Sequence, residues 1–230
     1  LDNSGGLLTK VASVFYNLSS TDTNDTLQKI AQDLAPKMSE HSDNINLNEA
    51  LFKRVKKVYD DYSIGGNEKT PLTTEQKMLL DNTYKRFVRS GANLSVADKD
   101  KLRKLNSELS LLNLKYGDNL LAETNAYELV IDKKEDLAGL PAEIIEAAAT
   151  EAKSKGKDGK WIFTLSNSSV MPFLQYSSNR DLRQTLWNAY QKRGNNDNQY
   201  DNKEVVKQIA NLRMEKAQLL GYKNHAAYVL

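Results

Sequence analysis

Apolar residues recur at intervals of three and four positions through most of this 230-residue sequence. That spacing gathers them on one face of an α-helix, and such a face has to be buried against another element. We expect the segment near 95–120 to form the longest helix, because its leucines keep the spacing over the greatest length. The pattern predicts helices at about 7–18, 27–38, 51–62, 73–90, 95–120, 144–152, 182–190 and 201–219, and the start of another at 226.

Capping signals mark several of these helix ends. Thr73 and Gln76 have the spacing of a capping box, in which each side chain accepts a hydrogen bond from a backbone N–H that the helix leaves free. Gly221 is predicted to be the C-cap of the helix at 201–219. Further starts are predicted at Ser95 with Asp98, at Asp201 with Glu204 and at Pro141 as a first helical residue, and 65–71 is predicted to be a surface loop.

Two segments depart from the helical pattern. Residues 127–131 and 161–165 are rich in β-branched and aromatic side chains over the length of a strand. They predict two short strands, with Trp161 and Phe163 facing one core, and leave open whether the strands pair. A turn is predicted at 171–174, where Phe173 and Tyr176 are expected to pack in the core or, as a less favoured alternative, to line a groove. The expected fold is mainly α, a multi-helix array with two short β-strands.

Charge and composition exclude several classes of protein. The 32 basic and 30 acidic residues are interspersed, and the basic stretches 53–57 and 153–157 are short and close to acids, which is typical of solvated surface. There is no cysteine to form a disulfide or a thiolate site, and no apolar run long enough to span a bilayer. We therefore expect a soluble protein with no nucleic-acid partner and no membrane segment.

No stretch of the sequence holds a complete catalytic motif. The two histidines, His41 and His225, are far apart, and neither belongs to an H-E-x-x-H sequence; we interpret His41 as surface and His225 as a cap or packing residue. Phosphate-binding glycine loops and nucleophile elbows are missing too. Carboxylates such as Asp60, Asp61 and Glu123 would have to converge in a cleft to act as an acid and base pair. The predicted catalytic, cofactor-binding and metal-binding residues of this chain are therefore none.

The two ends of the sequence indicate a piece of a longer protein. The chain begins with Leu1 rather than Met, and it ends on the apolar run Ala-Ala-Tyr-Val-Leu without a helix stop signal. We expect the chain to have been cut within a helix.

The stretch from Leu212 to Tyr228, near the C-terminus, is the motif of this sequence that is most specific for a protein family. It reads Leu212-x-x-x-Lys216-Ala217-x-Leu219-Leu220-Gly221-Tyr222-x-Asn224-His225-Ala226-x-Tyr228. This stretch resembles the segment that precedes the catalytic region in the thimet oligopeptidase family of zinc metallopeptidases. The resemblance extends over essentially the whole chain, through residues 14–18, 35–37, 89–94, 121–127 and 137–141. The stretches 91–94 and 122–127 are more similar to the bacterial peptidyl-dipeptidase branch than to oligopeptidase A.

The resemblance implies a two-lobed, mostly helical shell around a deep channel, with the zinc helix in the C-terminal half. Residues 1–230 would be one helical, neurolysin-like N-terminal region with a small β-containing insert at about 126–166, truncated before the catalytic zinc domain. The parent would bind zinc and hydrolyse short peptides by removing C-terminal dipeptides. This chain would bind no zinc, would be inactive alone, and would form channel wall against which the missing catalytic region packs.

Two alternatives remain open at this point. One is a fragment of an oligopeptidase A-like endopeptidase, and the other is a non-enzymatic helical module that binds peptides or a partner. The resemblance also implies a bacterial origin, in the cytoplasm or the periplasm.

Overall fold

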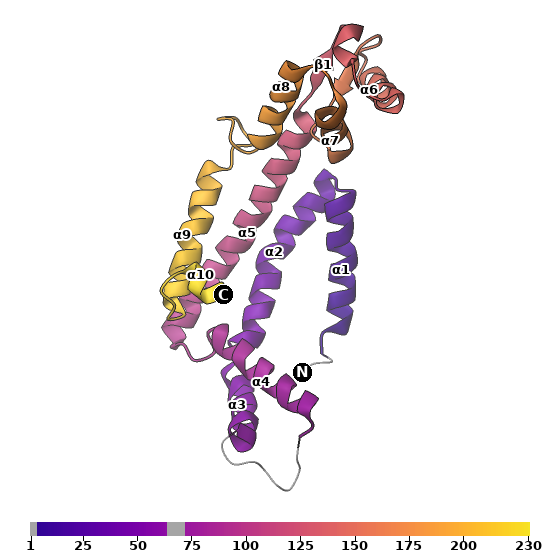
Figure 1. Ribbon diagram of the computed structural model, residues 1–230. Helices are drawn as coiled ribbons and strands as arrows, with labels where there is room; N and C mark the ends of the chain where they lie inside the picture. The colour runs from indigo at the N-terminus through magenta and orange to yellow at the C-terminus, as the bar shows by residue number, and fades with distance from the viewer. Residues whose placement is uncertain (1–3, 64–71) are drawn as a thin grey trace. The chain divides into compact units, whose positions relative to one another are not determined.

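The computed structural model describes residues 4–63 and 72–230, so the predicted loop at 65–71 lies outside the described residues (Figure 1). The predicted mainly α fold is confirmed, with one small antiparallel sheet. The chain divides into two compact units, the first made of Leu1–Leu114 with Lys207–Leu230 and the second of Lys115–Val206. No helix in the described parts of the chain is both long and apolar enough to cross a bilayer.

Among the described residues of the first unit, all regular secondary structure is helical. The predicted segments are confirmed, and the longest described helix is α5 with 31 residues. The helices that contribute to this unit are α1 (Gly6–Thr21), α2 (Asp25–Asn46), α3 (Glu49–Ser63), α4 (Thr74–Arg89), the first part of α5 (Val96–Ala126), most of α9 (Lys203–Leu219) and α10 (His225–Val229).

Helices α3 and α4 pack through aromatic side chains. Phe52 and Phe87 are buried together with Val55, and the rings of Tyr59 and Tyr84 stack with centroids 3.9 Å apart. Burial of these rings stabilises the pair far more than the intrinsic helix propensity of either segment does.

The predicted capping box at the start of α4 is confirmed. The Gln76 backbone N–H donates to the Thr73 hydroxyl at 3.3 Å, and the Thr73 N–H donates to the Gln76 side chain at 2.9 Å. Two N–H groups that the first turn leaves unpaired are thereby satisfied.

Replacing Thr73 with alanine is expected to destabilise the first unit by about 1 kcal/mol, the usual effect of losing an N-cap side chain. Urea unfolding followed by far-UV circular dichroism measures it. Thr74→Ala, one residue further on and exposed, is the matched control and should change stability by less than about 0.5 kcal/mol. Equal effects of the two substitutions would show that the capping box contributes nothing.

The second unit contains the sheet. Strands β1 and β2 pair antiparallel, with Leu129 opposite Phe163 and Ile131 opposite Trp161, which settles the pairing that the sequence left open. The unit consists of the end of α5, β1 (Leu129–Ile131), the short 3-10 helix η1 (Lys134–Leu137), α6 (Ala142–Ser154), β2 (Trp161–Phe163), α7 (Asn167–Tyr176) and α8 (Arg180–Gln191).

The core of the second unit lies between this sheet and helices α6, α7 and α8. Phe163 is buried in it and Trp161 packs against it, as the strand alternation predicted. Pro141 is the N-cap of α6, one residue before the position we predicted. A glycine is required at 139, because φ is +87° there and a Cβ would lie 2.4 Å from the Tyr176 carbonyl oxygen.

The predicted turn at 171–174 is wrong, because these residues lie inside α7. Val170 and Phe173 are both completely buried and lie three residues apart, on one face of the helix. Their burial outweighs the cost of Pro172, which lacks the N–H of a normal helical residue. Phe173 thus belongs to the core, as the favoured alternative had it, while Tyr176 is 45% exposed.

Candidate functional site

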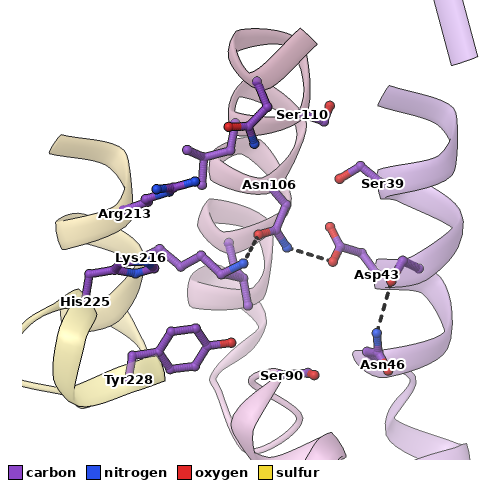
Figure 2. A pocket seen from close by; sticks show the side chains of 14 residues that line it. Ser39, Asp43, Asn46, Ser90, Asn106, Ser110, Arg213, Lys216, His225 and Tyr228 are labelled. Atoms are coloured by element: carbon purple, nitrogen blue, oxygen red, sulfur yellow. Dashed lines mark hydrogen bonds between the residues drawn. The ribbon is translucent and has the colours of Figure 1, made fainter. Parts of the chain in front are cut away.

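A polar pocket of about 450 Å³ lies in the first unit, lined by residues of α2, α5, α9 and α10 (Figure 2). Its charged side chains are Asp43 from α2 and Arg213 and Lys216 from α9. Serine and asparagine side chains line much of the rest. Small-molecule sites are concave and use a few placed polar groups to orient the ligand, and the lining of this pocket is more polar than is usual for such sites.

A chain of hydrogen bonds runs across this pocket (Figure 2). Asn106 Nδ2 donates to Asp43 Oδ1 at 2.8 Å, and Lys216 Nζ donates to Asn106 Oδ1 at 2.7 Å. One amide therefore bridges a carboxylate and an ammonium group that come from two other helices. Asp43 is only 6% exposed, so its charge is held away from water.

Of the three bridged residues, Asp43 is buried, and Asn106 and Lys216 are half-buried. On α2 the buried residues Ala31, Ala35 and Asp43 are spaced by multiples of four, so Asp43 lies in phase with the inward face of the helix. On α9 Lys216 precedes the completely buried Ala217. None of the motifs in the sequence points to this cluster. The signal that could have found it is a charged residue in phase with an apolar stripe, because such a residue needs a partner inside the protein.

Burial shifts the pKa of each of the two charged residues in the direction that favours its neutral form. Desolvation raises the pKa of Asp43 above its ordinary value, although the Asn106 hydrogen bond and the charges of Arg103 and Lys216 oppose the shift. Desolvation lowers the pKa of Lys216, against the attraction of Asp43. Each charge is therefore incompletely compensated within the described residues.

Replacing Asp43 with asparagine is expected to raise the free energy of unfolding at about pH 7. A raised pKa means that the native state binds protons more strongly than the unfolded chain, so stability falls as pH rises from 3.8 through the native pKa. The amide has the same shape and carries no charge, so it avoids this loss. Urea unfolding at neutral pH and below pH 3.8 measures the effect, and the gain should vanish in acid. A variant that is less stable than wild type at neutral pH would contradict this.

The C-terminal helix α10 forms one side of the pocket. Its N-cap is Asn224, whose side chain accepts from the Ala227 N–H at 2.9 Å. Of the two predicted roles of His225, the cap is therefore wrong, whereas its ring lies near that of Tyr228, with centroids 6.3 Å apart. The His225 ring lines the pocket, and its Nδ1 atom is buried without a hydrogen-bond partner among the described residues. Arg89 holds this helix in place by donating to the Tyr228 carbonyl oxygen. Its guanidinium also lies 5.4 Å from the Tyr228 ring centroid.

The other titratable residues singled out from the sequence do not meet at one site. His41 is exposed on α2, as predicted. Asp60 and Asp61 form surface ion pairs with Lys56 and Lys57 on α3. In the second unit, Lys155 and Lys157 pair with Glu128. These contacts are typical of solvated surface and contribute little stability.

Glu123 is a buried carboxylate whose hydrogen bonds hold a loop in place. Its oxygens accept hydrogen bonds from the Gly194 N–H and from the side-chain amides of Asn196 and Asn198. Burial disfavours its charge, but these three donors outweigh that effect and lower the pKa. Glu123 thus fastens the loop after α8 to α5.

Within the residues that the structure describes, no group of three or more histidine, cysteine, aspartate or glutamate side chains is placed to hold a metal ion. Zinc sites in proteins need three or four such ligands around one point. The two histidines and the pocket carboxylate of this chain do not supply them, so the described residues do not fit a zinc site.

Comparisons with known proteins relate the sequence to a family. Residues 173–230 match the model of peptidase family M3. The dipeptidyl carboxypeptidase of Escherichia coli is 34% identical over 228 residues, which cover 99% of this chain and 33% of the relative. The enzyme of the same name from Salmonella typhimurium is also 34% identical, over 229 residues.

Oligopeptidase A of Escherichia coli is 30% identical over 224 residues, covering 96% of this chain and 32% of that protein. The chain thus spans about a third of the length of these relatives. Over nearly the whole chain, the identity to the dipeptidyl carboxypeptidase of Escherichia coli (34%) is higher than that to its oligopeptidase A (30%), in agreement with the branch that the sequence motifs indicated. The chain is thus similar to peptidase family M3, the thimet oligopeptidase family, and in particular to its dipeptidyl carboxypeptidases.

Proposed function

We propose that this chain is the N-terminal part of a zinc metallopeptidase that removes dipeptides from the C-termini of short peptides. The observation that carries the proposal is the 34% identity to dipeptidyl carboxypeptidase over 99% of the chain, although the chain spans 33% of that relative. The bound zinc would supply a Lewis acid for the attack of water on the scissile carbonyl. The residues of this chain would take no part in that step.

The contribution of this segment would be to shape the substrate channel. Its long helices offer walls that admit short, extended peptides and exclude folded proteins, which is a contribution of orientation rather than chemistry. The remaining part of the parent would pack against these helices. A large exposed apolar surface on α1, where Leu7, Val11 and Val14 are each at least 60% exposed, supports such packing.

The test is to extend the chain into the coding sequence that follows Leu230 and to compare the product with the 230-residue chain. The extended protein is expected to bind zinc and to release a C-terminal dipeptide from an N-acetylated tetrapeptide. The shorter chain is expected to do neither. Metal analysis and mass spectrometry of the products measure both results. An extended sequence that lacks H-E-x-x-H would falsify the proposal.

An endopeptidase of the oligopeptidase A type is the second candidate, supported by 30% identity over 96% of the chain. The two candidates differ in their products. An endopeptidase would cut a peptide of about ten residues internally, even when its C-terminus is amidated. A peptidyl-dipeptidase would release dipeptides in sequence from the free C-terminus.

A further inference from the structure

Two buried polar atoms in the wall of the polar pocket have no hydrogen-bond partner among the described residues. They are Asp43 Oδ2 and His225 Nδ1. Asp43 is 94% buried, since only 6% of it is exposed, and its other oxygen is bonded to Asn106. Figure 2 shows Oδ2 turned toward the space between α2 and α5. A buried carboxylate oxygen without a donor is costly, so a ligand donor that reached it would satisfy an otherwise unpaired acceptor.

The opposite wall of the pocket is cationic. Lys216 donates to Asn106 at 2.7 Å, and an ammonium group has two further N–H donors to offer. Arg213 lies one helical turn earlier and lines the same pocket. The pocket therefore presents an acceptor for a cation on α2 and donors for an anion on α9 (Figure 2).

We propose that this pocket binds a free dipeptide, with the ligand ammonium group at Asp43 and the ligand carboxylate at Lys216 and Arg213. The volume of about 450 Å³ lies in the range of small-molecule sites, roughly 300–1,000 Å³. The two ends of a dipeptide carry the charges that these walls lack.

The spacing of the charged residues favours a dipeptide over a single amino acid. Asp43 and Lys216 do not touch but are separated by the Asn106 amide, which bonds to both. A dipeptide has the same layout, with one amide between its ammonium and carboxylate groups. A single amino acid holds its two charges too close together to reach both walls. The hydroxyl groups of Ser39 and Ser110 border the same space and can bond the ligand amide (Figure 2).

A dipeptide is also the product class of the proposed reaction. Only this link to a product rests on the proposed function, because the binding site consists entirely of residues of this chain. Binding is therefore measured on the 230-residue chain without any catalysis. Failure to bind would leave the proposed peptidase activity untouched, and failure of the extended protein to cleave peptides would leave the binding site untouched.

Isothermal titration calorimetry of the 230-residue chain with Ala-Ala tests the site. The comparison ligands are N-acetyl-Ala-Ala, which lacks the ammonium group, Ala-Ala amide, which lacks the carboxylate, and alanine. We expect saturable binding of Ala-Ala and at least about tenfold weaker binding of each comparison ligand, since each loses one charged hydrogen bond. The proposal is overturned if Ala-Ala gives no saturable heat up to about 10 mM, or if a blocked ligand or alanine binds equally well.

Variants of the chain assign the two ends of the ligand. Asp43→Asn is expected to weaken Ala-Ala at least about tenfold while leaving N-acetyl-Ala-Ala unchanged. Lys216→Met is expected to weaken Ala-Ala at least about tenfold while leaving Ala-Ala amide unchanged, so that selectivity against the amide is lost. The matched control is Asp33→Asn, on the same helix, with a side chain 61% exposed. Equal effects of Asp43→Asn and Asp33→Asn would overturn the assignment. Should a variant fail to fold by circular dichroism, the four ligands on the unmodified chain still decide the question.

Discussion

Replacing Phe173 with alanine is expected to lower the free energy of unfolding of the second unit by about 3–5 kcal/mol. Phe173 is completely buried, and its ring centroid lies 4.5 Å from that of Phe163. The substitution removes the ring and leaves a cavity that neighbouring side chains can fill only in part. The effect should be at the upper end of this range, because packing of this side chain also offsets the cost of Pro172 within α7.

Tryptophan fluorescence during urea unfolding is the appropriate measurement. Both tryptophans of the chain, Trp161 and Trp187, lie in the second unit, so the signal reports on that unit. Tyr176→Ala is the matched control on the same helix, since Tyr176 is 45% exposed, and it should cost less than about 1 kcal/mol. If Phe173→Ala cost no more than this control, the described core could not be correct.

Replacing Glu123 with alanine is expected to cost about 2–4 kcal/mol at neutral pH, because the substitution leaves several donors without an acceptor. The donors are the Gly194 N–H and the amides of Asn196 and Asn198, the last at 2.6 Å. The loop that follows α8 would lose its attachment to α5. Glu146→Ala, at an exposed position on α6, is the matched control and should have almost no effect.

The stability contributed by Glu123 should depend on pH with a definite sign. The pKa of Glu123 is lowered from its ordinary value of 4.5. The contribution is therefore fully present above pH 4.5, and it is lost as pH falls through the lower native value. The difference between wild type and Glu123→Ala should shrink in acid. A difference that grows below pH 4.5 would contradict the described hydrogen bonds.

The candidate site is built from residues that no local sequence pattern connects. Asp43, Asn106 and Lys216 are separated by 63 and 110 positions along the chain. No local pattern links residues so distant, and each of them would be an ordinary surface residue if its helix were turned. His225 was noticed from the sequence, but its unpartnered Nδ1 atom becomes apparent only when α10 is placed beside α9.

The sequence by itself determined most of the helices, the capping box of α4, the two strands and the family resemblance, because helix periodicity, capping and motif spacing are local properties of the chain. The tertiary structure alone decided that the strands pair, that Met171–Leu174 is helical, and that Asp43 and Lys216 meet across Asn106. The physical reason is the same in each case. Burial against distant residues supplies more free energy than local preferences do, so it can override a proline and place a charge in a helix interface.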